Sequence, residues 1–176
     1  MNIIIYGSKY GTTKQYAKEL SKKTNIKAEG YEDIKTINEY ETIIYIGALY
    51  AGGVLGMAKT FKKISNCKNK KIIIATVGLS DPMDEENINN IENNMKRQLS
   101  NEIYKKASIY HLRGGIDYSK LNFLHKTMMR ILYEKAKSLP EEKKTTEDKL
   151  MIQSLLQKVN FVDFSSLENI IDEIKK

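Results

Sequence analysis

The segment from Gly7 to Thr13 contains residue types that could hold a phosphate group. Its sequence, GSKYGTT, follows an apolar run and precedes a helix-like run. Its glycines allow a tight backbone turn, the following helix would offer its unpaired amides, and its serine and threonines add hydroxyl donors. No lysine follows the second glycine, which excludes a nucleoside triphosphate loop and favours a single terminal phosphate. The alternative is a strand-to-helix turn capped by Thr12 or Thr13, with no ligand.

Strand-like and helix-like segments alternate along the chain and indicate the sheet that must position this loop. Apolar runs typical of buried parallel strands are separated by stretches with apolar residues at helical spacing. This order predicts an α/β fold with a parallel sheet and right-handed crossovers, in a single domain of residues 1–176. The expected strands are 2–6, 26–31, 42–47, 71–78 and 108–112, and a strand-like run at 159–164 follows the polar excursion. The expected helices are 14–23, 57–64, 82–99, 120–137, 150–156 and 167–174.

Two of these helices have recognisable start signals. Asp81 can cap the helix that begins near residue 82, with Pro82 at its first position. Ser165 and Glu168 have the spacing of a capping box at the start of the last helix. Each signal predicts the residue at which a helix begins and the loop before it ends.

Three loops should meet at one edge of the sheet, because ligands of open α/β sheets bind beyond the carboxyl ends of the strands, where the strand order reverses. These are the loop 8–13, the glycine-rich loop 47–53 and the loop 78–82. Tyr50 is the aromatic residue placed to stack on a flat ring. A planar heterocycle with a single phosphate indicates flavin mononucleotide (FMN).

Two motifs resemble those of the flavodoxin family. Residues 8–13 (SKYGTT) resemble the phosphate loop Ser/Thr-x-Thr-Gly-x-Thr, and residues 40–47 (YETIIYIG) resemble the run before the second flavin loop. The polar excursion of residues 114–157, between LRGG and VDF, is similar to that of the menaquinone-dependent protoporphyrinogen oxidases. The resemblance implies a flavodoxin-like, doubly wound parallel five-stranded sheet of order 2-1-3-4-5 in three α/β/α layers, with an insertion splitting the last strand. It also implies bound FMN.

The resemblance assigns cofactor contacts position by position. The phosphate contacts are Ser8, Lys9, Tyr10, Gly11, Thr12 and Thr13. The ring contacts are Ala48, Leu49, Tyr50, Ala51 and Gly52 in the second loop and Gly78, Leu79, Ser80 and Asp81 in the third. Two departures stand out: Tyr10 replaces the usual middle threonine, and the second loop reaches Tyr50 about one residue early and lacks the usual proline. In addition, the third loop carries no tyrosine or tryptophan. One flavin face is therefore either open to a substrate or covered by Leu79 or Met83.

Composition limits the remaining possibilities. The net charge of +7 comes from lysines interspersed with 22 acidic residues, which argues against nucleic acid and for an anionic ligand or partner. No apolar run reaches the length of a membrane span and no signal peptide is evident, so we expect a cytoplasmic protein. With Cys67 as the sole cysteine and His111 and His125 as the only histidines, we expect no metal site and treat both histidines as structural or surface residues.

The expected helix 120–137 combines an apolar stripe with a basic surface. The stripe consists of Leu121, Leu124, Met128, Ile131 and Leu132. The basic residues are Lys120, Lys126, Arg130, Lys135 and Lys137, opposed only by Glu134. Such a helix could contact an anionic membrane surface or an acidic partner. In the alternative the stripe packs against the edge of the sheet and the lysines are merely solvated.

Three functions are consistent with the sequence. The first is an FMN-dependent oxidoreductase, similar to the quinone-dependent protoporphyrinogen oxidases, that acts on a quinone or another small organic substrate or on a protein partner. No side-chain acid or base announces itself as catalytic, so the flavin would carry the chemistry. The second is a flavodoxin electron carrier that serves protein redox partners; such carriers are typically acidic, unlike this chain. The third is a flavodoxin-like module without a cofactor.

Overall fold

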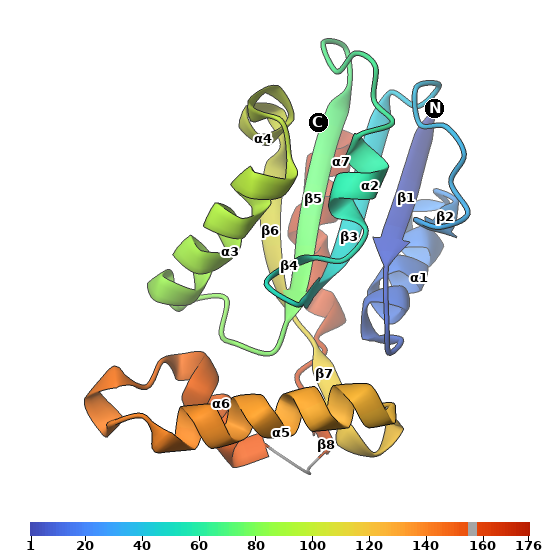
Figure 1. The fold of residues 1–176 in the computed structure, drawn as a ribbon. Coiled ribbons are helices and arrows are strands. Elements are labelled where there is room, and N and C mark those ends of the chain that lie inside the picture. Colours follow the sequence, from blue (N-terminus) through green and yellow to red (C-terminus); the bar gives the residue numbers. More distant parts are fainter. Residues whose placement is uncertain (155–157) are drawn as a thin grey trace.

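The computed structural model describes residues 1–154 and 158–176, which form a parallel sheet flanked by helices (Figure 1). Five parallel strands lie in the order β2-β1-β3-β5-β6, and the short β4 pairs antiparallel with β3. The expected order of a doubly wound sheet is confirmed. The strands are β1 (Asn2–Gly7), β2 (Ala28–Gly30), β3 (Thr42–Tyr50), β4 (Gly53–Val54), β5 (Lys71–Gly78), β6 (Ser108–Arg113), β7 (Gly115–Asp117) and β8 (Lys158–Asn160).

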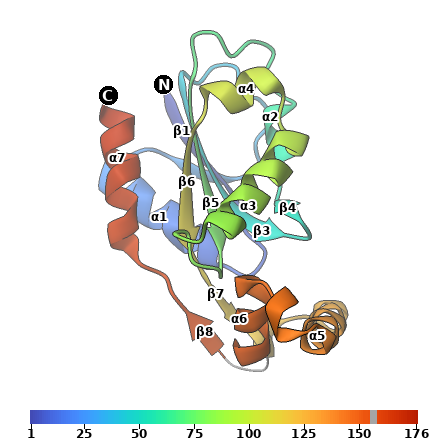
Figure 2. The same cartoon turned by 90° about the vertical axis from the view of Figure 1, so that its left-hand side faces the viewer.

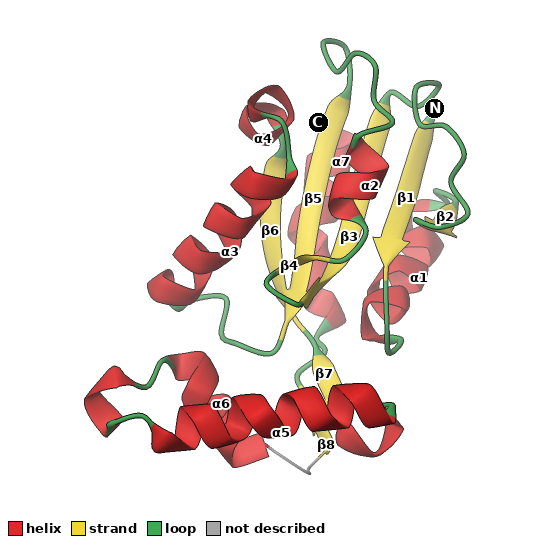
Figure 3. Ribbon diagram, in the orientation of Figure 1, coloured by secondary structure: helices red, strands yellow, loops and turns green. Residues whose placement is uncertain are grey.

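Helices cover both faces of the sheet, which gives the three-layer architecture (Figure 3). α1 and α7 lie on one face, and α2, α3 and α4 lie on the other. The helices are α1 (Thr12–Thr24), α2 (Met57–Phe61), α3 (Glu85–Gln98), α4 (Asn101–Lys106), α5 (Phe123–Ser138), α6 (Thr146–Ser154) and α7 (Glu168–Lys175).

The core is built from alternate residues of the central strands. In β1, Ile3 and Ile5 face the layer of α2, α3 and α4, whereas Ile4 faces α1 and α7. This alternation is the period of two expected for a strand that is buried on both faces. Tyr45 of β3 and Tyr16 of α1 are the largest fully buried side chains. Tyr45 packs in the core on the side of α2, α3 and α4, and Tyr16 packs in the core on the side of α1 and α7.

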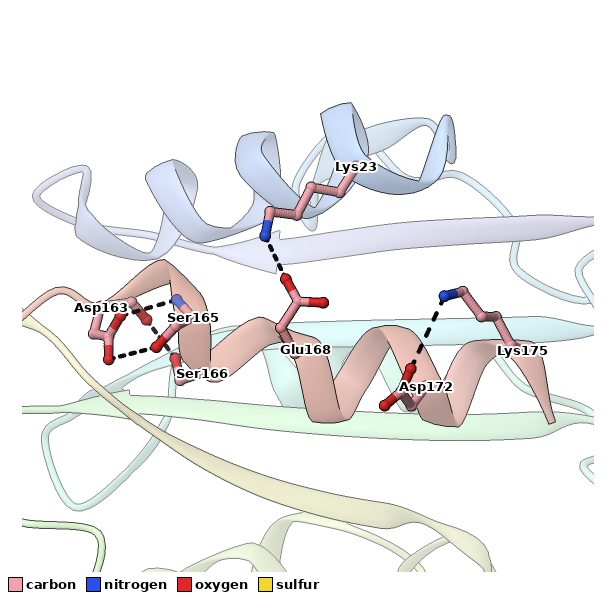
Figure 4. Close-up of polar contacts among 7 residues, drawn as sticks. All are labelled: Lys23, Asp163, Ser165, Ser166, Glu168, Asp172 and Lys175. Carbon is pink, nitrogen blue, oxygen red and sulfur yellow. Dashed lines mark hydrogen bonds and ion pairs between the residues drawn. The ribbon is translucent and has the colours of Figure 1, made fainter.

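The last helix is tied to the first by a side-chain contact across one face of the sheet (Figure 4). Lys23 Nζ of α1 donates to Glu168 Oε1 of α7 at 2.5 Å. The expected capping box at the start of this helix is wrong. Asp163 instead accepts hydrogen bonds from the amide and hydroxyl of Ser165, at 2.9 and 2.8 Å, and a short 3₁₀ turn (Phe164–Leu167) leads into α7.

The predicted start of the helix after β5 is also wrong. Asp84, three residues beyond Asp81, caps α3 by accepting from the amides of Glu86 and Asn87. Asp81 instead closes a local turn by accepting from the amide of Met83. Both aspartates satisfy the local preference for a cap, but Asp84 leaves a longer loop between β5 and the helix. The third loop of the expected site is therefore longer than the sequence indicated.

The excursion after β6 is a separate substructure at the carboxyl end of the sheet (Figures 1 and 2). It leaves through β7 and returns through β8, which pair with each other as an antiparallel ribbon rather than with the main sheet. The expected second half of the last strand, at 159–164, is therefore wrong, because the returning chain does not rejoin the sheet beside β6. Between them lie α5 and α6, whose most extensive contacts in the described part of the excursion are with each other. We refer to residues 114–157 as the insertion. The end of the helical segment expected at 150–156 falls on residues 155–157, which lie outside the described residues.

Tyr16 of α1 holds the entry and exit of the insertion together. Its hydroxyl donates to the carbonyl of Arg113 at 2.6 Å and accepts from the amide of Asp163 at 3.0 Å. Burial raises the pKa of this phenol above its ordinary value of 10.0. The folded state therefore prefers the neutral phenol, which can make both bonds.

We expect Tyr16→Phe to lower the free energy of unfolding by about 1–3 kcal/mol, because it leaves a carbonyl and an amide without their partner. Denaturant melts would measure the loss, with Tyr6→Phe, a half-buried tyrosine of β1, as the control. The raised pKa also determines how this stabilisation depends on pH. The contribution of Tyr16 to the free energy of unfolding is complete below pH 10 and is lost as the pH rises through the raised pKa of the folded state. A Tyr16→Phe variant as stable as the control would contradict this role.

Candidate functional site

The loop between β1 and α1 directs backbone amides toward a single oxygen. Gly11 has a positive φ of 98°, a conformation that favours glycine, and α1 begins directly after it without a side-chain cap. Ser8 Oγ accepts hydrogen bonds from the amides of Gly11, at 3.2 Å, and Lys14, at 3.3 Å. Capping by Thr12 or Thr13, the alternative considered for this loop, is therefore wrong: an oxygen from within the loop meets the amides.

The other members of the first loop have different surroundings. Thr13 is buried, with 1% of its surface exposed, at the start of α1. Thr12 Oγ1 donates to the carbonyl of Gly115 at 3.2 Å, so this hydroxyl also fastens the insertion to the loop. Lys9 and Tyr10 are exposed at the tip of the loop. Of the predicted phosphate donors, Thr12 is thus already engaged with the insertion.

The second predicted loop is a tight hairpin. β3 continues to Tyr50, and β4 returns beside it, with Leu49 opposite Val54 and Tyr50 opposite Gly53. The turn residues Ala51 and Gly52 have positive φ values of 49° and 77°, as a two-residue hairpin turn requires. Regular strand pairing therefore holds Tyr50 at the carboxyl edge of the sheet, more rigidly than a glycine-rich loop would.

The third loop packs against the second at its start. A Cβ atom at Gly78 would come within 2.6 Å of Leu49 Cδ1, so the start of this loop lies close against the hairpin. Leu79 is half-buried and Ser80 is buried, while Asp81 is exposed and Met83 is almost fully exposed. The structure thus brings Gly78 next to the hairpin but leaves Asp81 and Met83 in solvent. Of the two residues considered as a cover for a bound ring, Met83 lies in the open.

Arg113, at the end of β6, connects the third loop to the exit of the insertion. Its guanidinium donates to the carbonyl of Leu79 at 3.1 and 3.3 Å and stacks over the ring of Phe161, 3.8 Å from the centroid. The amide of Gly114 donates to the carbonyl of Gly78 at 2.6 Å. The base of the insertion is thereby fixed to the same loop that carries predicted ring contacts.

His125 of α5 is the site residue that sequence reasoning missed. Its ring is hydrogen-bonded to the hydroxyls of both Tyr10 and Tyr50, and only 7% of its surface is exposed. It was expected to be structural or on the surface, since a lone histidine carries no motif. Its only local signal is Asn122, whose side chain accepts from the amide of His125 at 2.8 Å and starts α5. The second histidine, His111, is half-buried in β6 beside Thr76, and its partial burial lowers its pKa.

A cavity of about 180 Å³ lies between the first loop and the ribbon of the insertion. Tyr10, Thr12 and Gln15 line one side of it, and Lys120 and Lys158 line the other. The nearby carboxyl of Asp117 accepts from Ser119, and this bond, with the two lysines, lowers its pKa. The wall of the cavity next to the candidate phosphate loop therefore carries two lysines and one carboxylate.

Two classes of site find no support in the described residues. No group of three or more histidine, cysteine, aspartate or glutamate side chains is placed to hold a metal ion across residues 1–154 and 158–176. Within the same ranges, no helix is long and apolar enough to cross a membrane.

Comparisons with solved structures return flavodoxin-like proteins at low identity. A protein described as a flavoprotein from Bacteroides uniformis is 15% identical, with 64% of this chain and 90% of that chain covered and a TM-score of 0.47. A Fusobacterium nucleatum flavodoxin variant bound to flavin mononucleotide is 20% identical, with 69% and 72% covered and a TM-score of 0.42. A Pseudomonas aeruginosa flavodoxin variant is 16% identical, with 76% and 95% covered and a TM-score of 0.39.

No curated protein matches the chain. The model of the flavodoxin domain family, however, matches residues 3–144, which is well over half of the sequence and includes all three loops of the site. Together with the parallel sheet and its strand order, this match establishes the family: the chain belongs to the flavodoxin domain family.

Proposed function

We propose that this protein binds FMN and uses it as an electron-transferring oxidoreductase. The observation that carries the proposal is the convergence of the Gly11 and Lys14 amides on one oxygen at the start of α1. That point lies beyond the carboxyl end of β1, whose neighbours are β2 on one side and β3 on the other. The strand order reverses there, which is the usual place for a ligand in an open α/β sheet.

The first loop suits a phosphate electrostatically. The first amides of a helix have no partner within it and carry its partial positive charge. α1 has 13 residues and no acidic side chain in its first turn, so nothing there repels an anion. Lys9 and Lys14 are exposed on either side of Gly11. A phosphate oxygen would take the place of Ser8 Oγ as acceptor, and the serine hydroxyl could then donate to it.

The hairpin and the third loop suit the flat part of the cofactor. Tyr50 lies at the carboxyl edge on a rigid hairpin, and the adjacent loop lies close against it at Gly78. FMN, when bound, supplies the redox chemistry by exchanging electrons with a substrate or partner. The residues of this chain would bind and orient it and shield it from water.

The basic surface and the insertion favour an oxidoreductase over an electron carrier that serves only proteins. The chain carries +7 net charge, and α5 crosses the carboxyl edge of the sheet where the cofactor would lie (Figure 1). A helix in that position would keep protein partners away from the cofactor but would still admit small molecules such as a quinone. The resemblance to quinone-dependent protoporphyrinogen oxidases supports the same substrate class.

The absorption spectrum of the purified protein, followed by titration of the ligand-free form with FMN, FAD and riboflavin, tests cofactor binding. We expect FMN to bind most tightly, since the loop accommodates one terminal phosphate. Anaerobic reoxidation of the reduced protein then separates the two functions: quinones should reoxidise it faster than small acidic redox proteins do. Preferential binding of FAD would contradict the cofactor assignment, and reoxidation by redox proteins alone would favour the carrier.

We expect Thr13→Val to raise the dissociation constant for FMN about ten- to a hundredfold, because it removes one hydroxyl donor to a charged acceptor. Thr13 is buried, so valine keeps its shape, and Thr13→Ser is the matched control that keeps the hydroxyl. Riboflavin, which lacks the phosphate, should bind both variants alike. Equal losses for FMN and riboflavin would show that the variant damages the loop rather than a phosphate contact.

We further propose that α5 rests on an anionic lipid surface. Of the apolar stripe, Leu121 is buried, but Leu124 is 71% exposed, Ile131 64% and Leu132 39%. Phe123, at the start of the same helix, is 86% exposed. Lys126, Arg130, Lys135 and Lys137 are exposed on the same helix, with Glu134 as its single acid. Apolar residues that enter the lipid headgroup region beside lysines that attract acidic headgroups are the features of an interfacial helix.

Sedimentation with lipid vesicles would measure this contact. We expect binding to phosphatidylglycerol vesicles but not to phosphatidylcholine, and a loss of several-fold when Lys126 and Arg130 are both changed to glutamate. Lys18→Glu with Lys22→Glu, an exposed pair on α1 with the same change in charge, should have little effect. The effect should shrink at high salt, where exposed charges are screened. Equal losses for the two pairs would mean that net charge, not this helix, governs binding.

A further inference from the structure

His125 joins two loops of the candidate site through its two ring nitrogens. Nδ1 is hydrogen-bonded to Tyr10 Oη and Nε2 to Tyr50 Oη. The rings meet edge-on, with centroids 5.6 Å apart for Tyr10 and 5.4 Å for Tyr50. A neutral imidazole has one donor and one acceptor nitrogen, and a phenol can act as either, so all three side chains can be satisfied together. We call Tyr10, His125 and Tyr50 the latch.

The latch connects three distant parts of the chain. Tyr10 belongs to the phosphate loop, Tyr50 to the hairpin, and His125 to the first turn of α5, where Asn122 holds its amide. The most extensive contacts of α5 are with α6, in the same insertion, and not with the sheet. The latch is therefore a specific attachment of α5 to the carboxyl edge, at the end of the helix nearest the phosphate loop.

The latch also fills the space between the two loops. His125 is nearly inaccessible to solvent there, although most residues of α5 are exposed. A cofactor with its phosphate in the first loop and its ring at Tyr50 must pass through the same space. The side chain and the cofactor would compete for the faces and hydroxyls of the same two tyrosines.

We propose that His125 controls access to the cofactor site: the closed latch holds α5 over the carboxyl edge, and FMN binding displaces His125 from between the tyrosines. This inference rests on the proposed function, since it takes FMN as the ligand. Entry of the cofactor then releases the amino-terminal end of α5. α5 is thus a lid whose position reports whether the cofactor is present.

Binding kinetics of FMN test the competition. We expect His125→Ala to accelerate FMN association and to lower the dissociation constant by about tenfold, because two side-chain hydrogen bonds no longer need to break. Tyr50→Phe, which removes one of those bonds but keeps the ring, should show a smaller acceleration. Thr127→Ala, an exposed residue on the same helix, is the control. Either of two results would overturn the proposal. Unchanged FMN binding by His125→Ala would mean that His125 does not affect the cofactor, and weaker binding would mean that His125 helps to hold the cofactor.

Trypsin cleavage within the insertion tests the lid without measuring cofactor affinity. In the ligand-free protein, His125→Ala should be cut several-fold faster than Thr127→Ala, and FMN should accelerate cleavage of the wild-type chain toward the same rate. Equal rates for the two variants, or protection by FMN, would overturn the lid. If no variant binds FMN, the proposed function fails, while the ligand-free comparison still decides whether the latch holds the insertion.

Discussion

The first backbone amides of α1 have no hydrogen-bond acceptor within the helix, and the arrangement of the site follows from this constraint. A helix that starts at the carboxyl end of a central strand points unpaired N–H groups at the edge where ligands bind. In this chain Ser8 provides that acceptor from within the loop, and Gly11 provides the backbone conformation that brings the amides round to it. The sheet, with two fully buried faces, fixes the loop in place.

The insertion makes this edge different from a simple open sheet. Its ribbon is fastened to the first loop through Thr12, to the third loop through Arg113 and to α1 through Tyr16. From that base α5 extends across the carboxyl ends of the strands (Figure 1) and reaches the hairpin through His125. The same insertion therefore shapes the approach to the site and presents an exposed apolar and basic surface. The helix that covers this edge is thus also the helix that carries the exposed apolar and basic side chains.

Much of the fold could be predicted from the sequence because its signals are local. Buried parallel strands such as β3 and β5 appear as continuous apolar runs, and the glycine and hydroxyl residues of the first loop mark the strand-to-helix turn. The start of α3 could not be predicted, since Asp81 and Asp84 both satisfy the local preference for a cap and only the packing of the helix selects one. The expected loop at 47–53 is instead a hairpin for a related reason: the pairing of Tyr50 with Gly53 depends on the strand beside it.

His125 was beyond prediction from sequence because its partners are far away along the chain. It lies 115 residues from Tyr10 and 75 from Tyr50, and no spacing rule connects them. The pairing of β8 with β7 could not be predicted for the same reason, since the whole excursion separates the two strands along the chain.

The most direct test of the central claim is a nitrogen–proton NMR titration that follows the backbone amides of Gly11 and Lys14. If these amides hold the phosphate, addition of FMN should shift both resonances strongly, and riboflavin at matched saturation should leave them nearly unchanged. Equal shifts with the two ligands, or FMN shifts confined to other parts of the chain, would contradict the account.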